Sequence, residues 1–124
     1  MPSASKKPMI LICDDEEGVR ESFKVILSDD YSLRFTKNSP EAVESLKTTS
    51  PAAVLLDIKM PKKNGAEILR QIKKLRPSLP VIIVTGYQSV ELAQQVIADG
   101  AADYIPKPFA PDRLLKALAA ALKK

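Results

Sequence analysis

Short, wholly apolar runs alternate with amphipathic segments along most of this 124-residue chain. Residues 9–13, 53–56 and 81–84 contain no polar side chain apart from a cysteine. Strands that are apolar throughout are typical of a parallel sheet with helices on both faces. The segments between these runs carry apolar residues at helical spacing. The alternation therefore predicts an α/β domain.

Five strands are expected, each followed by a helix. They are residues 9–13, 31–36, 53–56, 81–84 and 102–105. The second strand alternates apolar and polar residues, so we expect it at an edge of the sheet, with one face in water. This (βα)5 pattern predicts a doubly wound, flavodoxin-like parallel sheet with strand order 2-1-3-4-5.

Several residues mark helix ends. Ser39, followed by Pro40 and Glu41, is expected to be the N-cap of the second helix. Ser89 is expected to cap the fourth helix, which Gly100 ends. The inward side of the fourth helix is expected to comprise four apolar residues: Val90, Ala93, Val96 and Ile97.

The net charge of +4 comes from the ends of the chain, because Lys6, Lys7, Lys123 and Lys124 account for all of it. A neutral body and the lack of a recognition-helix signature argue against direct nucleic-acid binding. One local excess of positive charge remains at residues 59–76, which contain seven basic residues and one acidic residue. A solvated helix face is the favoured interpretation, and a docking or phosphate-attracting surface is the alternative.

Other composition features exclude whole classes of chemistry. The chain has no histidine, so histidine catalysis and histidine metal ligation are excluded. Its single cysteine, Cys13, cannot form an internal disulfide and is expected to be a small core residue. No segment has the length of a membrane span or the pattern of a signal peptide, so we expect a cytoplasmic protein.

Polar side chains follow four of the expected strands. Asp14 and Asp15 follow the first strand, Asp57 the third and Thr85 the fourth, while the fifth runs into Lys107. Ligands of open parallel sheets gather beyond the carboxyl ends of the strands, where the strand order reverses. With order 2-1-3-4-5 this point lies between strands one and three, so the five side chains are expected at one rim.

Such a set suits phosphoryl chemistry on a divalent cation. Carboxylates held close together repel one another unless a cation intervenes, and an all-oxygen shell suits Mg²⁺. A carboxylate can also act as a nucleophile and hold a phosphoryl group as an acyl phosphate, with a hydroxyl and an ammonium binding its oxygens. Each acid alone would be interpreted as a solvated strand end; the five together argue against that.

From residue 9 to about residue 122 the chain resembles the receiver domains of bacterial two-component response regulators. Residues 98–109 resemble receivers of the NtrC and FixJ type. The resemblance rests on four motifs in order: Asp14-Asp15, Asp57 in Asp-x-x-Met-Pro-x-x-x-Gly, Thr85-Gly86, and residues 103–109 with the sequence Asp-Tyr-Ile-Pro-Lys-Pro-Phe.

The resemblance implies a phosphoacceptor and a metal site. Asp57 would accept a phosphoryl group from a sensor histidine kinase or a histidine phosphotransfer protein. Asp15 and Asp57 would ligate Mg²⁺ directly, the backbone carbonyl of Lys59 would be a third ligand, and Asp14 would act through water. The protein would catalyse only its own phosphorylation and dephosphorylation and would not be an enzyme.

The resemblance also implies switch residues. Thr85 would close on the phosphoryl oxygens, and Lys107 would pair with the phosphate. Tyr104 would swing inward as Thr85 moves. The peptide bond between Lys107 and Pro108 would be cis.

The expected boundaries are a disordered leader at residues 1–8 and a receiver domain at residues 9–124. An effector domain absent from this chain is a possible further partner. Phosphorylation is expected to act on the face formed by the fourth helix, fifth strand and fifth helix, as a partner or homodimer surface. Candidate residues on that face are Val90, Glu91, Tyr104 and Arg113.

Two residues are candidates for setting the lifetime of the acyl phosphate. Lys59 and Tyr87 each lie two positions beyond a site residue, namely Asp57 and Thr85. At these positions they would flank the path of the attacking water.

Two other classes of function stay open at this point. One is a small phosphohydrolase with an aspartyl-phosphate intermediate, but such haloacid-dehalogenase-type proteins place their acids as Asp-x-Asp after the first strand, whereas Asp14 and Asp15 are adjacent here. The other is a phosphate-independent interaction module in which the acids are unused.

Overall fold

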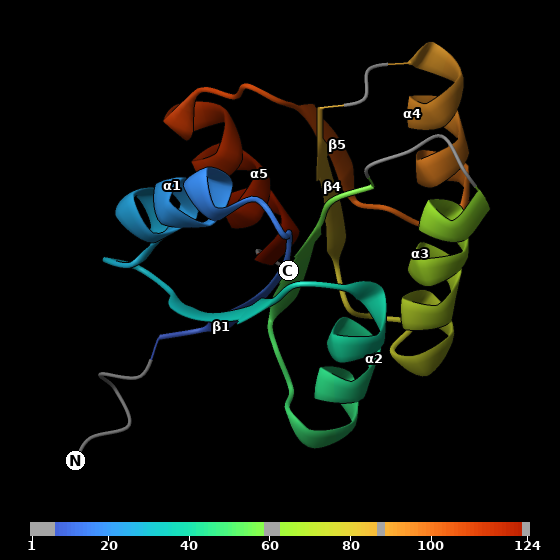
Figure 1. The fold of residues 1–124 in the computed structure, drawn as a ribbon, viewed down its shortest axis with the longest axis horizontal. Helices are drawn as coiled ribbons and strands as arrows, with labels where there is room; N and C mark the ends of the chain where they lie inside the picture. Colours follow the sequence, from blue (N-terminus) through green and yellow to red (C-terminus); the bar gives the residue numbers. More distant parts are fainter. Residues whose placement is uncertain (1–6, 59–62, 87–88, 123–124) are drawn as a thin grey trace.

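A computed structural model describes residues 7–58, 63–86 and 89–122. It contains a five-stranded parallel sheet between two layers of helices (Figure 1). The strands are β1 Met9–Cys13, β2 Ser32–Thr36, β3 Ala53–Leu56, β4 Val81–Thr85 and β5 Asp103–Pro106. The helices are α1 Glu17–Leu27, α2 Ser39–Thr48, α3 Lys63–Leu75, α4 Val90–Ala98 and α5 Pro111–Leu122. The sheet order is β2-β1-β3-β4-β5, which confirms the predicted fold class.

The sheet has a separate apolar core on each face because successive strand residues point to opposite sides. Leu11 and Cys13 of β1 pack in the core beneath α2, α3 and α4. Ile10 and Ile12 of the same strand pack in the core beneath α1 and α5. Figure 1 shows the two helical layers on either side of the strands. The continuous apolar runs therefore reflect burial on both faces.

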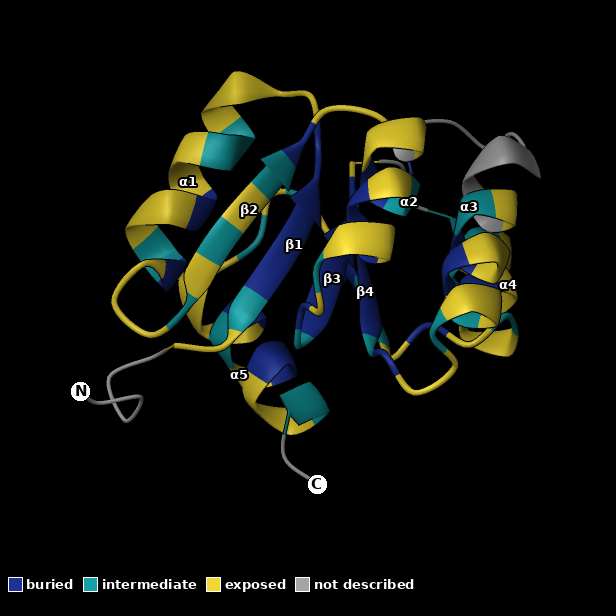
Figure 2. Cartoon of the chain, turned by 90° about the horizontal axis from the view of Figure 1, so that it is seen from below, coloured by how far each residue is buried: buried dark blue, intermediate teal, exposed yellow. Residues whose placement is uncertain are grey.

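The second strand is an edge strand, as predicted. It pairs with β1 in register from Met9–Ser32 to Cys13–Thr36. Its outward residues Ser32 and Arg34 are exposed, and Figure 2 shows the mixed burial of β2 beside the buried β1.

The N-cap of α2 is Asn38 and not Ser39, which is the first helical residue. The Asn38 side chain accepts a hydrogen bond from the backbone N–H of Glu41, and the Glu41 carboxylate accepts one from the backbone N–H of Lys37. The pair resembles a capping box, except that Glu41 bonds the residue before the N-cap, and the helix starts one residue earlier than expected. The predicted cap Ser89 does accept from the backbone N–H of Leu92.

The inward side of α4 differs from the prediction. Val96 is buried and Leu92 packs against the same core, whereas Val90 is 70% and Ile97 48% exposed. Leu92 and Val96 are four residues apart and so share one stripe of the helix. Val90 and Ile97 lie on a neighbouring stripe that faces outward, which makes them an exposed apolar surface.

Several cations of the basic excess have structural partners. Arg70 forms an ion pair with Asp99 at 3.0 Å. The Lys73 ammonium donates to the backbone carbonyl of Leu79 at 2.8 Å, and its stem lies against Gly100, whose φ of +108° favours glycine. Arg76 donates to the backbone carbonyls of Leu46 and Thr49 at the end of α2.

The strand register brings the candidate site together. Cys13 pairs with Leu56 across β1 and β3, so the residues that follow them, Asp14 and Asp57, lie side by side. The backbone N–H of Asp57 donates to the carbonyl of Cys13 at 3.0 Å, which extends the pairing by one residue. Cys13 itself is buried, and burial raises the pKa of its thiol to about 11.

None of the helices in the described residues is long and apolar enough to span a membrane.

Candidate functional site

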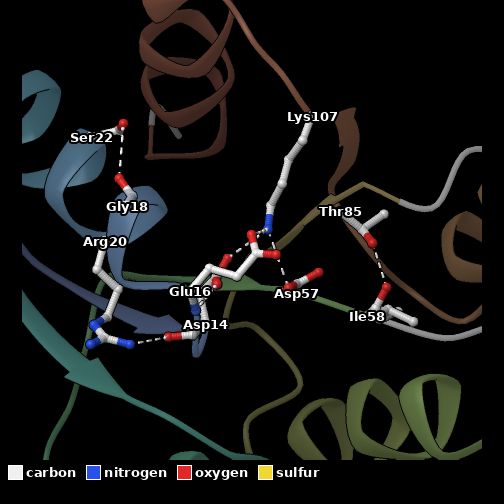
Figure 3. A network of polar contacts seen from close by, with 9 residues as sticks. All are labelled: Asp14, Glu16, Gly18, Arg20, Ser22, Asp57, Ile58, Thr85 and Lys107. Atoms are coloured by element: carbon white, nitrogen blue, oxygen red, sulfur yellow. Dashed lines mark hydrogen bonds and ion pairs between the residues drawn. The ribbon is translucent and has the colours of Figure 1, made fainter.

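One ammonium group lies among three carboxylates at the carboxyl end of the sheet. Lys107 Nζ is 3.0 Å from Asp14 Oδ2, 3.0 Å from Glu16 Oε1 and 3.2 Å from Asp57 Oδ2 (Figure 3). The Asp14, Asp57 and Lys107 side chains are 2%, 4% and 12% exposed, whereas that of Glu16 is 56% exposed. The site therefore has a buried interior with one solvated carboxylate at its rim.

Asp14 is held at every polar group. Its Oδ1 accepts a hydrogen bond from the backbone N–H of Glu16 at 2.9 Å, and its carbonyl accepts one from Arg20 Nη1 at 3.1 Å. Its backbone N–H donates to the carbonyl of Thr36 at 3.1 Å. With Lys107 on Oδ2, the carboxylate is fixed before any ligand arrives.

The carboxylate of Asp57 is less completely satisfied. Burial raises its pKa, and the nearby charge of Asp14 adds to this, while the Lys107 charge acts in the opposite direction. Its Oδ1 atom is buried and has no hydrogen-bond partner among the described residues. A buried carboxylate oxygen without a partner is costly in a folded protein, which makes Asp57 a candidate functional group.

Lys107 is positioned by its backbone as well as by the acids. Its N–H donates to the carbonyl of Thr85 at 2.8 Å, which ties the end of β5 to the end of β4. The Lys107-Pro108 peptide bond is cis, the isomer that the receiver resemblance implies. Burial lowers the pKa of the ammonium, but hydrogen bonding to Asp14 and the charge of Asp57 outweigh this effect and raise it overall.

Thr85 is fully buried beside Asp57. Its hydroxyl donates to the backbone carbonyl of Ile58 (Figure 3) and lies close enough to Asp57 to act against the rise in the pKa of that carboxyl. In this arrangement the hydroxyl faces the segment that follows β3.

The donor set fits a hard, partly hydrated cation. Carboxylate oxygens are the groups that Mg²⁺ prefers, and it commonly uses one or two of them together with waters. The unpartnered Oδ1 of Asp57 beside Asp14 is such a set. Asp15 is exposed at the same corner. Across residues 7–58, 63–86 and 89–122, no group of three acidic or cysteine side chains is arranged as a metal cluster. Lys107 lies between the Asp14 and Asp57 carboxylates.

One further predicted residue, Tyr104, lies within the described part of the chain. Tyr104 is half-buried on β5 and packs against the core beneath α4. Two other predicted residues lie outside the described residues: Lys59, whose backbone carbonyl is the predicted third metal ligand, and Tyr87.

Two residues of the site were not predicted from the sequence, Glu16 and Arg20. Glu16 stands at the N-cap of α1, a position at which glutamate is uncommon, and its side chain makes no capping hydrogen bond. Arg20 lies one helical turn further along and donates to the Asp14 carbonyl. A glutamate directly after the acidic pair, at a position unsuited to it, was the signal available in the sequence.

Replacing Asp57 with asparagine is expected to stabilise the fold near pH 7. Because the pKa of Asp57 is raised in the folded state, ionisation of this group increasingly opposes folding as the pH rises from the pKa of the unfolded chain to that of the folded protein. We expect a gain of roughly 1 kcal/mol, or a few degrees in Tm, that shrinks as the pH falls towards about 4. Thermal unfolding followed by circular dichroism at several pH values measures it.

Asp103→Asn is the matched control. The hydrogen bonds from Arg113 hold the pKa of Asp103 below its usual range, so this variant should lose stability near pH 7. A lower Tm for Asp57→Asn near pH 7 would contradict this description of the site.

Comparison with known proteins agrees with the geometry. Residues 10–119 match the family model described as the response regulator receiver domain. The response regulator MprA of Mycobacterium sp. strain KMS is 37% identical over 116 residues, which are 93% of this chain and 50% of that protein. The chain thus spans about half the length of the curated relatives it matches.

Solved structures give the same result. A CheY-like response regulator receiver domain protein from Methanospirillum hungatei JF-1 is 34% identical with a TM-score of 0.86, and the match covers 94% of each chain. NtrX from Brucella abortus, solved in complex with ADP, is 35% identical with a TM-score of 0.85, over 94% of this chain and 27% of that one. The chain therefore belongs to the response regulator receiver family, the receiver domains of two-component systems.

Proposed function

We propose that this receiver domain accepts a phosphoryl group on Asp57 from a sensor histidine kinase or a histidine phosphotransfer protein. The observation that carries the proposal is the buried Asp57 carboxylate, with Lys107 on one oxygen and no partner on the other among the described residues. Among the described residues, no donor competes with a phosphoryl group or a metal ion for Asp57 Oδ1.

In this transfer the phosphoryl group moves intact from the donor histidine to Asp57. A carboxylate oxygen of Asp57 forms a bond to phosphorus while the bond from phosphorus to the donor's histidine nitrogen breaks, and that nitrogen takes up a proton. The Lys107 ammonium lies 3.2 Å from Asp57 Oδ2, so it can bind a phosphoryl oxygen with little movement. Thr85 supplies the second donor once its hydroxyl leaves the Ile58 carbonyl.

Asp57, Asp15, Asp14 through water and the carbonyl of Lys59 would hold Mg²⁺. When bound, the ion would neutralise charge on the transferring phosphoryl group. Lys107 compensates part of the charge of the Asp14 and Asp57 carboxylates in the structure described above.

The switch that we propose begins at Thr85. Movement of its hydroxyl towards the phosphoryl group would shift the start of the β4–α4 connection and draw Tyr104 inward. Lys59 and Tyr87 would then set how readily water reaches the acyl phosphate.

The domain would catalyse only its own phosphorylation and dephosphorylation and would turn over no other substrate. A phosphohydrolase is disfavoured because both oxygens of the Asp14 carboxylate are engaged, one by the Glu16 N–H and the other by Lys107, so Asp14 is not placed as a second free acid for catalysis. A phosphate-independent interaction module stays as the second candidate. The experiment below distinguishes it from the proposed phosphoacceptor.

The proposed receiver spans residues 9–124, with residues 1–8 as a leader. Because MprA is about twice as long as the matched region, we propose that this receiver acts through an effector domain, joined to it or separate. We propose a cytoplasmic location, without direct contact to membrane or nucleic acid.

Incubation with acetyl phosphate and Mg²⁺ is expected to add one phosphoryl group to the wild-type chain, read by intact mass. Asp57→Asn should show no adduct, because the amide is not a nucleophile towards phosphorus. Asp103→Asn, which alters a carboxylate outside the site, should label like the wild type. Removal of Mg²⁺ with a chelator should abolish labelling.

An unlabelled wild-type chain under these conditions would favour the phosphate-independent module. Labelling of Asp57→Asn to the wild-type level would show that another residue accepts the group.

We further propose that phosphorylation promotes self-association through α4, β5 and α5. This face carries the exposed Val90 on α4 and the ion pair between Arg113 of α5 and Asp103 of β5, whose charged atoms are 3.0 Å apart. An exposed apolar side chain flanked by charges is typical of the centre and rim of an interface.

Sedimentation velocity of the phosphorylated protein is expected to give a larger species than the unphosphorylated one. Val90→Glu should prevent the change, since it introduces a charge at the centre of the face. Val25→Glu is the matched control, because Val25 is 83% exposed on α1, away from this face. Equal disruption by both variants, or no change on phosphorylation, would refute the assignment.

A further inference from the structure

Glu16 is the third carboxylate on Lys107, and neither the phosphoacceptor role nor the fold requires it there. We propose that Glu16 is a positioning residue that holds the Lys107 ammonium against Asp57 before phosphorylation and thereby slows phosphoryl uptake. This inference rests on the proposed function of Asp57. Glu16 would then control how readily Lys107 becomes available to the phosphoryl group.

The first argument is the number of donors. A lysine ammonium has three N–H groups, and Lys107 has three carboxylate acceptors, at 3.0, 3.0 and 3.2 Å. These three carboxylates suffice to occupy all three of its donors. Lys107 cannot bind a phosphoryl oxygen without giving up one of these contacts.

The second argument identifies the contact that is released. The Asp14 and Asp57 side chains are almost completely buried, so water cannot solvate either carboxylate if Lys107 leaves it. Glu16 is 56% exposed, and its carboxylate would be hydrated at once. Release of Glu16 is therefore the least costly way to free one donor of Lys107.

The third argument concerns the placement of Glu16. The backbone N–H of Glu16 donates to Asp14 Oδ1, which fixes the residue at the start of α1. Its side chain does not cap the helix but extends to Lys107, as Figure 3 shows. A negative charge at this point also repels an incoming phosphoryl donor, which is itself an anion.

The test compares Glu16→Gln, Glu16→Asp and Glu17→Gln with the wild type. Glu16→Gln keeps the length of the side chain and removes its charge, whereas Glu16→Asp keeps the charge and shortens the reach to Lys107. Glu17 is exposed in the first turn of the same helix, so Glu17→Gln controls for net charge and for the helix dipole. Labelling rates are measured at saturating Mg²⁺ and low acetyl phosphate by intact mass over time.

We expect Glu16→Gln to label about three- to tenfold faster, the range given by Coulomb's law for a partly solvated charge about 6 Å from another. Glu16→Asp should also label faster, and Glu17→Gln should match the wild type. A second readout is independent of activity. In Mg²⁺-free protein the ¹H–¹⁵N signal of the Lys107 ammonium should be sharp in the wild type and in Glu17→Gln, and broadened in both Glu16 variants.

Three outcomes would overturn the inference: a wild-type rate for Glu16→Gln, an equal acceleration in Glu17→Gln, or a Glu16→Asp variant that behaves as wild type in both readouts. A wild-type chain that takes up no phosphoryl group would instead refute the proposed function. In that case the ammonium signal still tests whether Glu16 holds Lys107.

Discussion

The contact of one ammonium group with two buried carboxylates is the interaction on which the site depends. Asp14 and Asp57 lie side by side with almost no access to water, and Lys107 between them offsets their mutual repulsion. Burial nevertheless raises the pKa of Asp57 by more than the Lys107 charge lowers it. A site that is short of positive charge is suited to bind a divalent cation and to use Lys107 for a phosphoryl group.

The fold supplies this arrangement through backbone pairing. Parallel strands place their carboxyl ends at one edge, and the register of β1 with β3 sets Asp14 beside Asp57. The hydrogen bond from the Lys107 N–H to the Thr85 carbonyl brings the fifth strand to the same edge. Residues more than forty positions apart therefore meet without any long loop. The helices on both faces exclude water from the sheet beneath them.

Sequence patterns predicted those features that depend on strand burial and strand order. Uninterrupted apolar runs identified the strands, and their polar ends identified Asp14, Asp57 and Lys107 as neighbours. Features set by the rotation of a single helix or by a rim side chain were not predictable in this way. The helix α4 has apolar residues on several sides, so spacing alone did not show that Leu92 faces the core and Val90 the solvent. The ion pair of Glu16 likewise depends on where a flexible side chain comes to rest.

A crystal structure with Mg²⁺ and beryllium trifluoride, a tetrahedral mimic of the phosphoryl group, tests the central claim most directly. The account predicts the mimic on an oxygen of Asp57, the metal on the other oxygen, and the Lys107 ammonium moved from Glu16 to a fluorine atom. A mimic bound elsewhere, or a Lys107 that keeps all three carboxylate contacts beside the bound mimic, would contradict it.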